Sequence, residues 1–209
     1  MIGNNIHRLA EQLFLINRSI TGDGVRKTLT LINKHLKDLN VFEVPSGTKV
    51  LDWVVPKEWS IVSGHILSPS GKIFCDFNEN NLHVIGYSTP IDASISLKEL
   101  DKHLYSLPDQ SDAIPYVTSY YEERWGFCIS HEQRMLLEEG IYKVKIDSAL
   151  FNGSLTYGEL IIKGKTDKEV LLSTYICHPS MANNELSGPV VLTYLAKWLQ
   201  SLKSRKYTY

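Results

Sequence analysis

Helical and strand-like patterns of apolar residues succeed one another along the chain. Apolar positions recur at helical spacing over residues 6–16 and again over residues 24–36, which predicts two helices joined by a turn. A third helical pattern runs to Leu202 after Ser187-Gly-Pro189, with Ser187 as the expected N-cap and Pro189 in the first turn. The chain is therefore expected to begin and end with helices.

The middle of the chain is rich in short apolar runs separated by Gly, Pro, Ser and Asn. Residues 141–147 alternate between apolar and polar positions, as expected for a half-exposed strand, and Ser68-Pro-Ser-Gly71 is typical of a hairpin turn. Short helices are expected at residues 96–104 and 131–139. The other predicted strands or extended segments are 41–44, 61–67, 73–77, 82–85, 115–121, 126–129, 153–163 and 168–174.

A candidate metal-binding segment follows one apolar run near the end of the chain. Val170-Leu-Leu-Ser-Thr-Tyr-Ile-Cys177 predicts a buried strand, and buried parallel strands present functional groups at their carboxyl ends. His178 follows directly, and amide and acidic side chains lie between it and the next helix. Neutral imidazole is a common ligand for zinc, but for an isolated histidine at the end of a strand a hydrogen-bonded loop histidine is the more common role.

This segment resembles a known metal-binding loop. The order His178-Pro-Ser-x-Ala-Asn-Asn184-x-x-Ser187-Gly188 is similar to the first metal-binding loop of zinc aminopeptidases of the M28 type. The chain more closely resembles bacterial aminopeptidase-like proteins associated with polysaccharide biosynthesis, which carry a small domain inserted into the peptidase domain. Further blocks of this resemblance are Arg18-Ser-Ile-Thr-Gly-Asp-Gly-Val25, Val54-Val-Pro-Lys-Glu-Trp59, Asn81-Leu-His-Val-Ile-Gly-Tyr-Ser88 and Ser119-Tyr-Tyr-Glu-Glu-Arg-Trp-Gly-Phe-Cys128.

The resemblance implies an α/β fold divided into two domains. Residues 1–46 and 151–209 would form an incomplete aminopeptidase-like α/β domain, and residues 47–150 would form the inserted β-rich small domain. The remaining metal ligands and the carboxylate general base are expected beyond Tyr209. The chain is therefore expected to stop midway through the peptidase domain and to be inactive alone, and no catalytic residue is assigned within it.

The resemblance also implies that zinc is the cofactor, and it indicates which residues would bind it. His178 matches the first metal ligand, whereas Asn184 occupies the position of an aspartate that bridges two metals. The Asn184 amide is neutral and offers one carbonyl oxygen, so the usual two-zinc site is not expected. Glu185 is considered as a compensating carboxylate, although a shift by one residue would change the direction of its side chain.

Two functions follow from this resemblance. The first is an aminopeptidase-like zinc metallohydrolase that cleaves an N-terminal peptide bond or a related amide in a small-molecule substrate. The alternative is a non-catalytic module that binds a peptide or a glycan precursor. Aromatic side chains are dense in the middle region, where core packing is a more common role than lining a substrate cleft.

Composition excludes several other classes of protein. A net charge of −1 and a pI near 6.7 give no electrostatic basis for binding nucleic acid or an anionic membrane surface. No apolar stretch approaches the length that spans a bilayer, and the N-terminus lacks the apolar region of a signal peptide, so a cytoplasmic location is expected. Three widely separated cysteines argue against a disulfide framework. The sequence leaves open whether the chain forms a homo-oligomer.

Overall fold

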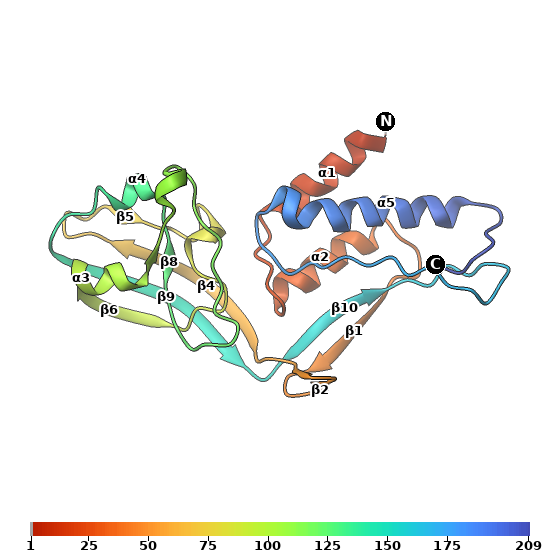
Figure 1. Cartoon of the computed structure of the whole chain (residues 1–209), viewed down its shortest axis with the longest axis horizontal. Helices are drawn as coiled ribbons and strands as arrows, with labels where there is room; N and C mark the ends of the chain where they lie inside the picture. The colour runs from red at the N-terminus through yellow and green to blue at the C-terminus, as the bar shows by residue number, and fades with distance from the viewer. Residues whose placement is uncertain (1) are drawn as a thin grey trace. The chain divides into compact units, whose positions relative to one another are not determined.

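The chain forms two compact units. The computed structural model describes residues 2–209; its first unit contains the chain up to Val55 and from Asn152 to Tyr209, and its second unit spans Pro56–Phe151 (Figure 1). The sequence placed the domain boundaries after residues 46 and 150. The contacts of residues 47–55 instead belong to the first unit, where β2 (Lys49–Val50) pairs with β3 (Trp53–Val54).

The first unit combines helices with an antiparallel pair of strands. Strand β1 pairs with β10 in an unbroken register from Asn40 opposite Glu159 to Pro45 opposite Ser154. The three helices predicted at the ends of the chain are confirmed, with ends shifted by up to four residues. The elements of this unit besides β2 and β3 are α1 (Ile2–Phe14), α2 (Asp23–Asn33), β1 (Asn40–Pro45), β10 (Ser154–Glu159), the π-helical turn η4 (Ala182–Leu186) and α5 (Ser187–Ser201).

Apolar faces of these helices form the core of the first unit. Leu9 and Leu13 of α1 pack with Leu186 of η4 and with Val190 of α5. A second cluster joins the C-terminal end of α2 to the later turns of α5, and its buried members are Ile32, Leu36, Ile162, Ala196 and Leu199. Residues three or four apart share one face of a helix, which is why the spacing in the sequence identified these faces.

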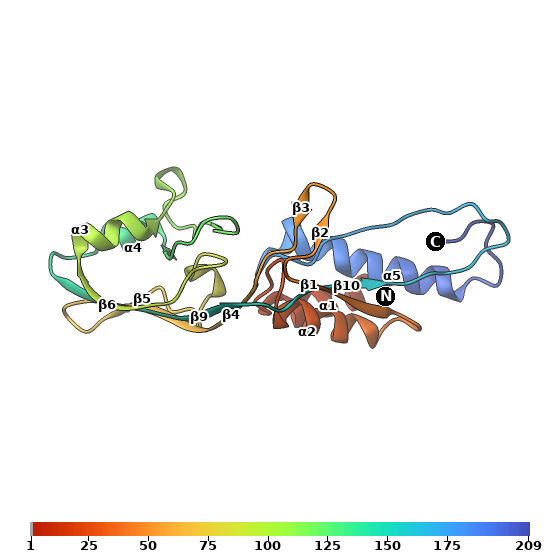
Figure 2. The ribbon, with the colours of Figure 1, turned by 90° about the horizontal axis from the view of Figure 1, so that it is seen from below.

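The second unit is a four-stranded antiparallel sheet with helices on one face. The strand order is β5 (Ile73–Phe74), β4 (Glu58–Leu67), β9 (Ile141–Phe151) and β6 (Ile91–Ser96). Figure 2 shows this sheet nearly edge-on, with α3 (Leu97–Leu100) and α4 (His131–Arg134) on the same side. The remaining elements are η1 (Asn81–His83), η2 (Asp101–His103), β7 (Leu104–Tyr105), η3 (Pro108–Gln110) and β8 (Phe127–Cys128).

Strand β9 shows how the sequence builds this sheet. Tyr142, Val144 and Ile146 point into the core beneath the helices, while the residues between them are exposed. The predicted alternation of residues 141–147 is thus confirmed, as is the turn at Ser68-Pro-Ser-Gly71, where the Gly71 N–H donates to the Ser68 carbonyl over 3.0 Å. Gly71 has a φ of 85°, a left-handed conformation that glycine adopts without a steric penalty.

Some local predictions for this unit are wrong. Residues 82–85 do not form a strand, because the turn η1 covers Asn81–His83, where the Leu82 N–H donates to Asn80 Oδ1 over 3.0 Å, and Val84 forms only an isolated bridge with Phe127. The helix expected at 96–104 shortens to α3 followed by η2, and the helix expected at 131–139 ends at Arg134. Short apolar patterns fit several local conformations, so tertiary contacts decide among them.

The aromatic side chains of the middle region divide between core and surface. Trp59 and Tyr87 are buried and stacked, with ring centroids 5.8 Å apart, and Phe127 is completely buried, as expected for core residues. Tyr121 is 79% exposed and does not belong to the core. No helix within residues 2–209 combines the length and apolar character needed to cross a bilayer.

The apolar run at residues 170–177 is the largest departure from the predicted elements. It was expected to form a buried strand, but residues 170–175 are exposed and the run belongs to no strand. Within residues 2–209, the backbone of this run is hydrogen-bonded to another segment only at its first residue, where the Val170 N–H donates to the Thr208 carbonyl over 2.9 Å. An apolar composition indicates a preference for burial, but a strand also needs a hydrogen-bonding partner along its edge.

Candidate metal-binding loop

Two of the candidate residues, Asn184 and Glu185, lie on the π-helical turn η4, which leads directly into α5, and His178 precedes this turn. The Leu186 N–H donates to the Met181 carbonyl over 3.0 Å, five residues back, as in a π-helix. The sequence predicted an irregular loop with Ser187 as N-cap, and this is wrong. Leu186 is the N-cap, and the Ser187 hydroxyl instead donates to the Asn183 carbonyl over 2.7 Å. Single π-turns are rare and are found frequently at functional sites.

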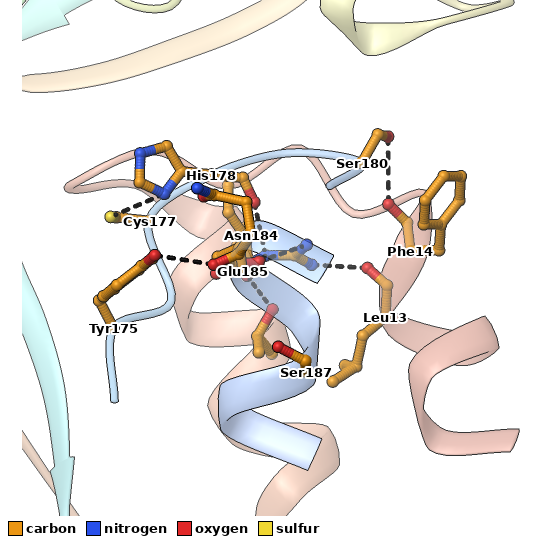
Figure 3. Close-up of polar contacts among 12 residues, drawn as sticks. Leu13, Phe14, Tyr175, Cys177, His178, Ser180, Asn184, Glu185 and Ser187 are labelled. Atoms are coloured by element: carbon orange, nitrogen blue, oxygen red, sulfur yellow. Dashed lines mark hydrogen bonds and ion pairs between the residues drawn. The ribbon is translucent and has the colours of Figure 1, made fainter. Parts of the chain in front are cut away.

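His178 is half-buried at the start of this loop. Its Nδ1 lies 3.3 Å from the Cys177 Sγ, and its ring meets the Tyr175 ring edge-on with centroids 5.3 Å apart (Figure 3). Burial lowers the pKa of His178, and the positive charge of Arg18 lowers it further. The imidazole is therefore held toward its neutral form, which is the form that binds metals.

Asn184 and Glu185 are adjacent in sequence but face different surroundings. Asn184 is exposed, and its backbone carbonyl accepts a hydrogen bond of 2.7 Å from the Tyr175 hydroxyl, whereas Glu185 is 1% exposed. Successive residues on a helical turn point in different directions. A shift that brought Glu185 to the position of Asn184 would therefore have to unwind the turn.

A buried ion pair holds the Glu185 carboxylate. Arg18 Nη2 lies 3.0 Å from Glu185 Oε2, Arg18 Nε donates to the same oxygen over 3.2 Å, and both side chains are fully buried. Burial raises the pKa of Glu185 and lowers the pKa of Arg18, and in each case the attraction of the partner opposes the shift. This carboxylate is engaged by Arg18, and its role as a metal ligand stays a prediction.

Arg18 also fixes the backbone around His178. Its Nε donates to the His178 carbonyl over 3.0 Å, and its Nη1 donates to the Leu13 carbonyl at the end of α1. The Ser180 hydroxyl adds a second tie by donating to the Phe14 carbonyl over 3.2 Å (Figure 3). The end of α1 and the following turn thus hold the loop in place.

Sequence reasoning did not identify Arg18 as part of this site. It lies in a turn rich in glycine and capping residues, where no periodicity marks a side chain as buried. The one hint that Arg18 matters was its place in the Arg18-Ser-Ile-Thr-Gly block of the family resemblance, and this block does not show which residue Arg18 pairs with. The ion pair joins residues 167 positions apart, a separation that no local pattern encodes.

The described residues do not form a complete zinc centre. Within residues 2–209 there is no group of three or more His, Cys, Asp or Glu side chains arranged to hold a metal ion. A catalytic zinc ion normally has about three protein ligands. Of the candidate ligands, His178 offers a suitable nitrogen, Asn184 offers only a neutral amide and Glu185 is paired with Arg18. Any centre that uses His178 therefore needs further ligands.

Gly188 lets the segment before His178 pass close to α5. A Cβ at residue 188 would collide with the Thr174 Oγ1. We expect Gly188→Ala to lower the free energy of unfolding of the first unit by about 1–3 kcal/mol, as overpacking does. Urea denaturation measures this, and Gly188→Ala combined with Thr174→Ala should recover most of the loss. Wild-type stability in the single variant would show that the two segments separate without cost.

The chain shares its fold with aminopeptidases and its sequence with one protein family. The chain has the α/β fold of aminopeptidases, as predicted: it matches the crystal structure of BSAP, a zinc aminopeptidase from Bacillus subtilis, with a TM-score of 0.55 and 15% identity over 99% of this chain and 59% of that one. At this identity the likeness concerns the fold alone. Residues 7–209 match the family described as "Domain of unknown function (DUF4910)", and the chain belongs to this family.

Two comparisons with Clostridium acetobutylicum proteins are much closer. The chain is 50% identical over 207 residues to a protein named "Putative polysaccharide biosynthesis protein with aminopeptidase-like domain", covering 99% of this chain and 47% of that protein. It also matches a crystal structure described as a "putative peptidase" from that organism, with a TM-score of 0.96 and 50% identity over 99% of this chain and 49% of that one. The chain thus spans about half the length of these relatives.

Proposed function

We propose that the chain supplies one side of the metal centre of an aminopeptidase-like hydrolase, with His178 as the ligand that it contributes. The observation that carries this proposal is the fixed loop at α5, where Arg18 holds the His178 backbone and the surroundings favour a neutral imidazole. The aminopeptidase-like fold and the name of the Clostridium acetobutylicum relative support the same class. The substrate proposed for this class is a peptide or a related amide.

The chain alone is proposed to be catalytically incomplete. Its described residues offer too few ligands for zinc, and the relatives that it matches are about twice as long. Zinc bound in a completed centre would polarise the scissile carbonyl and lower the pKa of its bound water. The contribution of this chain is to hold the neutral His178 at a fixed position through the Arg18 contacts.

A chimera tests this proposal. The chain replaces the matched half of the Clostridium acetobutylicum relative, and zinc content and hydrolysis of aminoacyl amides are then measured with and without a chelator. We expect zinc to bind, chelation to abolish hydrolysis, and His178→Ala to weaken zinc binding by at least about tenfold, since even residues outside the metal's own ligands have effects of this size. The unmodified relative provides the reference for both measurements.

His7→Ala is the matched control for the chimera. His7 lies on α1 in the same unit, but its side chain is 74% exposed and its neighbour is Glu11, so its removal should leave zinc binding unchanged. Equal loss of zinc in both histidine variants, or zinc binding that survives His178→Ala, would contradict the proposal.

The alternative is a non-catalytic module that binds a peptide or a glycan precursor, and one observation favours it. Asn184 is exposed beside His178 and brings no charge to offset that of a metal. In the chimera, Asn184→Asp should strengthen zinc binding if the loop belongs to a working centre. No zinc binding with either residue, together with saturable binding of a peptide or glycan precursor, would support the binding module. A cytoplasmic location and the absence of nucleic-acid and membrane partners belong to both proposals.

A further inference from the structure

An apolar cavity lies within the first unit. It has a volume of about 510 Å³ and is lined by α2, by residues 155–160 and 162, by residues 170–177 and by α5. Leu29 and Ile32 of α2 and Leu199 of α5 contribute to its walls, with Leu155 of β10 and Leu172. A cavity of this size, bounded by helices and by extended segments, has room for side chains of another segment.

One wall of this cavity is the apolar run 171–176, whose backbone pairs with no other strand within residues 2–209. Leu171 is 89% exposed and Tyr175 is 49% exposed, in the most apolar run of this unit outside its helices. Within residues 2–209, the backbone N–H groups of residues 171–176 donate no hydrogen bond to another segment. Proteins rarely leave a long apolar edge uncovered, because such an edge pairs readily with other strands.

The last residues of the chain enter between the two extended walls. Thr208 bonds to one wall in a parallel arrangement: its N–H donates to Lys168 over 3.0 Å, and its carbonyl accepts from Val170 over 2.9 Å. Tyr209 exchanges both backbone hydrogen bonds with Ile162 on the other wall, over 2.8 and 3.0 Å, which is the pattern of an antiparallel pair. Thr208 and Tyr209 are thus hydrogen-bonded to both walls.

We propose that a β-strand continuing the line of Thr208 and Tyr209 occupies this cavity. It would run parallel to residues 170–176 and antiparallel to the segment that leads from Ile162 back into β10. Both walls extend for about seven residues from these bonds, which is an ordinary strand length. The occupant is the segment that, in the relatives, directly follows the position matched to Tyr209, since those proteins are about twice as long.

A strand accounts for the walls better than a small apolar ligand does. Leu172, Thr174 and Ile176 donate to no other segment within residues 2–209, and their N–H groups need acceptors at the regular spacing of a backbone, which an apolar molecule does not provide. The TM-score of 0.96 indicates that the matched half of the longer relative has the same shape when the rest of its chain is present. The walls are therefore already arranged for the additional strand.

Amide hydrogen exchange tests this inference. We compare the 209-residue chain with the same chain lengthened at Tyr209 by about ten residues taken from the Clostridium acetobutylicum relative, and with a control that carries those residues in scrambled order. The native extension should slow exchange at Leu172, Thr174 and Ile176, which lie on the side of Val170, by at least about tenfold, while exchange in the second unit stays unchanged. Unchanged exchange at residues 171–176 in the lengthened chain would overturn the proposal.

Two proline variants test the direction of the strand. Alternate residues of an extended segment turn their N–H groups to the same side, so the Leu172 N–H follows that of Val170 toward the proposed strand and the Leu171 N–H faces away. Leu172→Pro should therefore abolish the protection at Thr174 and Ile176, and Leu171→Pro should retain it. Equal loss in both variants, with the second unit still protected, would overturn the proposed register.

Self-association is the competing explanation for the exposed edge. If the 209-residue chain elutes as a dimer and residues 171–176 are already protected in that dimer, a second copy covers this wall and the proposed occupant is wrong. A monomer with rapid exchange at residues 171–176 supports the proposal. Neither result depends on zinc or on hydrolysis.

Discussion

Replacing Glu185 by Ala is expected to lower the free energy of unfolding of the first unit by about 3–5 kcal/mol. The change leaves the Arg18 guanidinium buried without its counter-charge, among contacts that tie α1 to the loop at α5. Urea denaturation followed by circular dichroism measures the loss, with hydrogen exchange used to assign it to the first unit. Arg18→Ala should have an effect of similar size, because it leaves the Glu185 carboxylate alone.

The double variant Arg18→Met with Glu185→Leu separates the charge effect from simple loss of packing. Burial opposes the charged forms of both residues, as the directions of their pKa shifts indicate, so apolar replacements should be much less damaging than either single change. Glu99→Ala provides a surface control, because Glu99 pairs with Lys102 on an exposed helix. A Glu185→Ala variant that loses less than about 1 kcal/mol would show that the pair does not hold the loop.

Phe127→Ala is expected to lower the free energy of unfolding of the second unit by about 3–5 kcal/mol, the usual range for a phenylalanine removed from a core. Phe127 is completely buried and belongs to the cluster formed by β4, β9 and the covering helices. Hydrogen exchange distinguishes the two units: amides of β9 should lose protection, while amides of α5 should keep it.

Two further variants control for this result. Phe127→Leu keeps much of the apolar volume and should lose less stability than Phe127→Ala, and Tyr121→Ala removes an exposed ring and should change stability by less than about 0.5 kcal/mol. Equal loss of protection in α5 and β9 after Phe127→Ala would mean that the units unfold together. Their separate contact networks argue for independent behaviour.

The three candidate ligands have different surroundings in the structure. His178 does not end a strand as predicted but precedes the turn η4, and its surroundings favour the neutral ring; its role as a metal ligand stays a prediction. Asn184 is exposed on the same loop, and Glu185, considered as a substitute ligand, is directed inward to Arg18. These outcomes follow from the π-turn, which points two adjacent side chains in different directions.

The sequence by itself determined the local elements whose buried face has a regular period. The helices α1, α2 and α5 and the strand β9 were predicted because one face of each recurs at a fixed spacing, and burial of that face needs no knowledge of its partner. The order of these elements, together with the family resemblance, predicted the α/β fold that the aminopeptidase structures share.

Only the tertiary structure decided which segments and side chains interact with one another. Residues 170–177 have the composition of a buried strand, but whether such a run is buried depends on a neighbouring segment, and here its edge is uncovered within residues 2–209. The partnership of Arg18 with Glu185 likewise joins positions far apart along the chain. The local spacing of apolar residues indicates which face of an element is buried. Ion pairs and strand pairing instead depend on which distant segments come together when the chain folds.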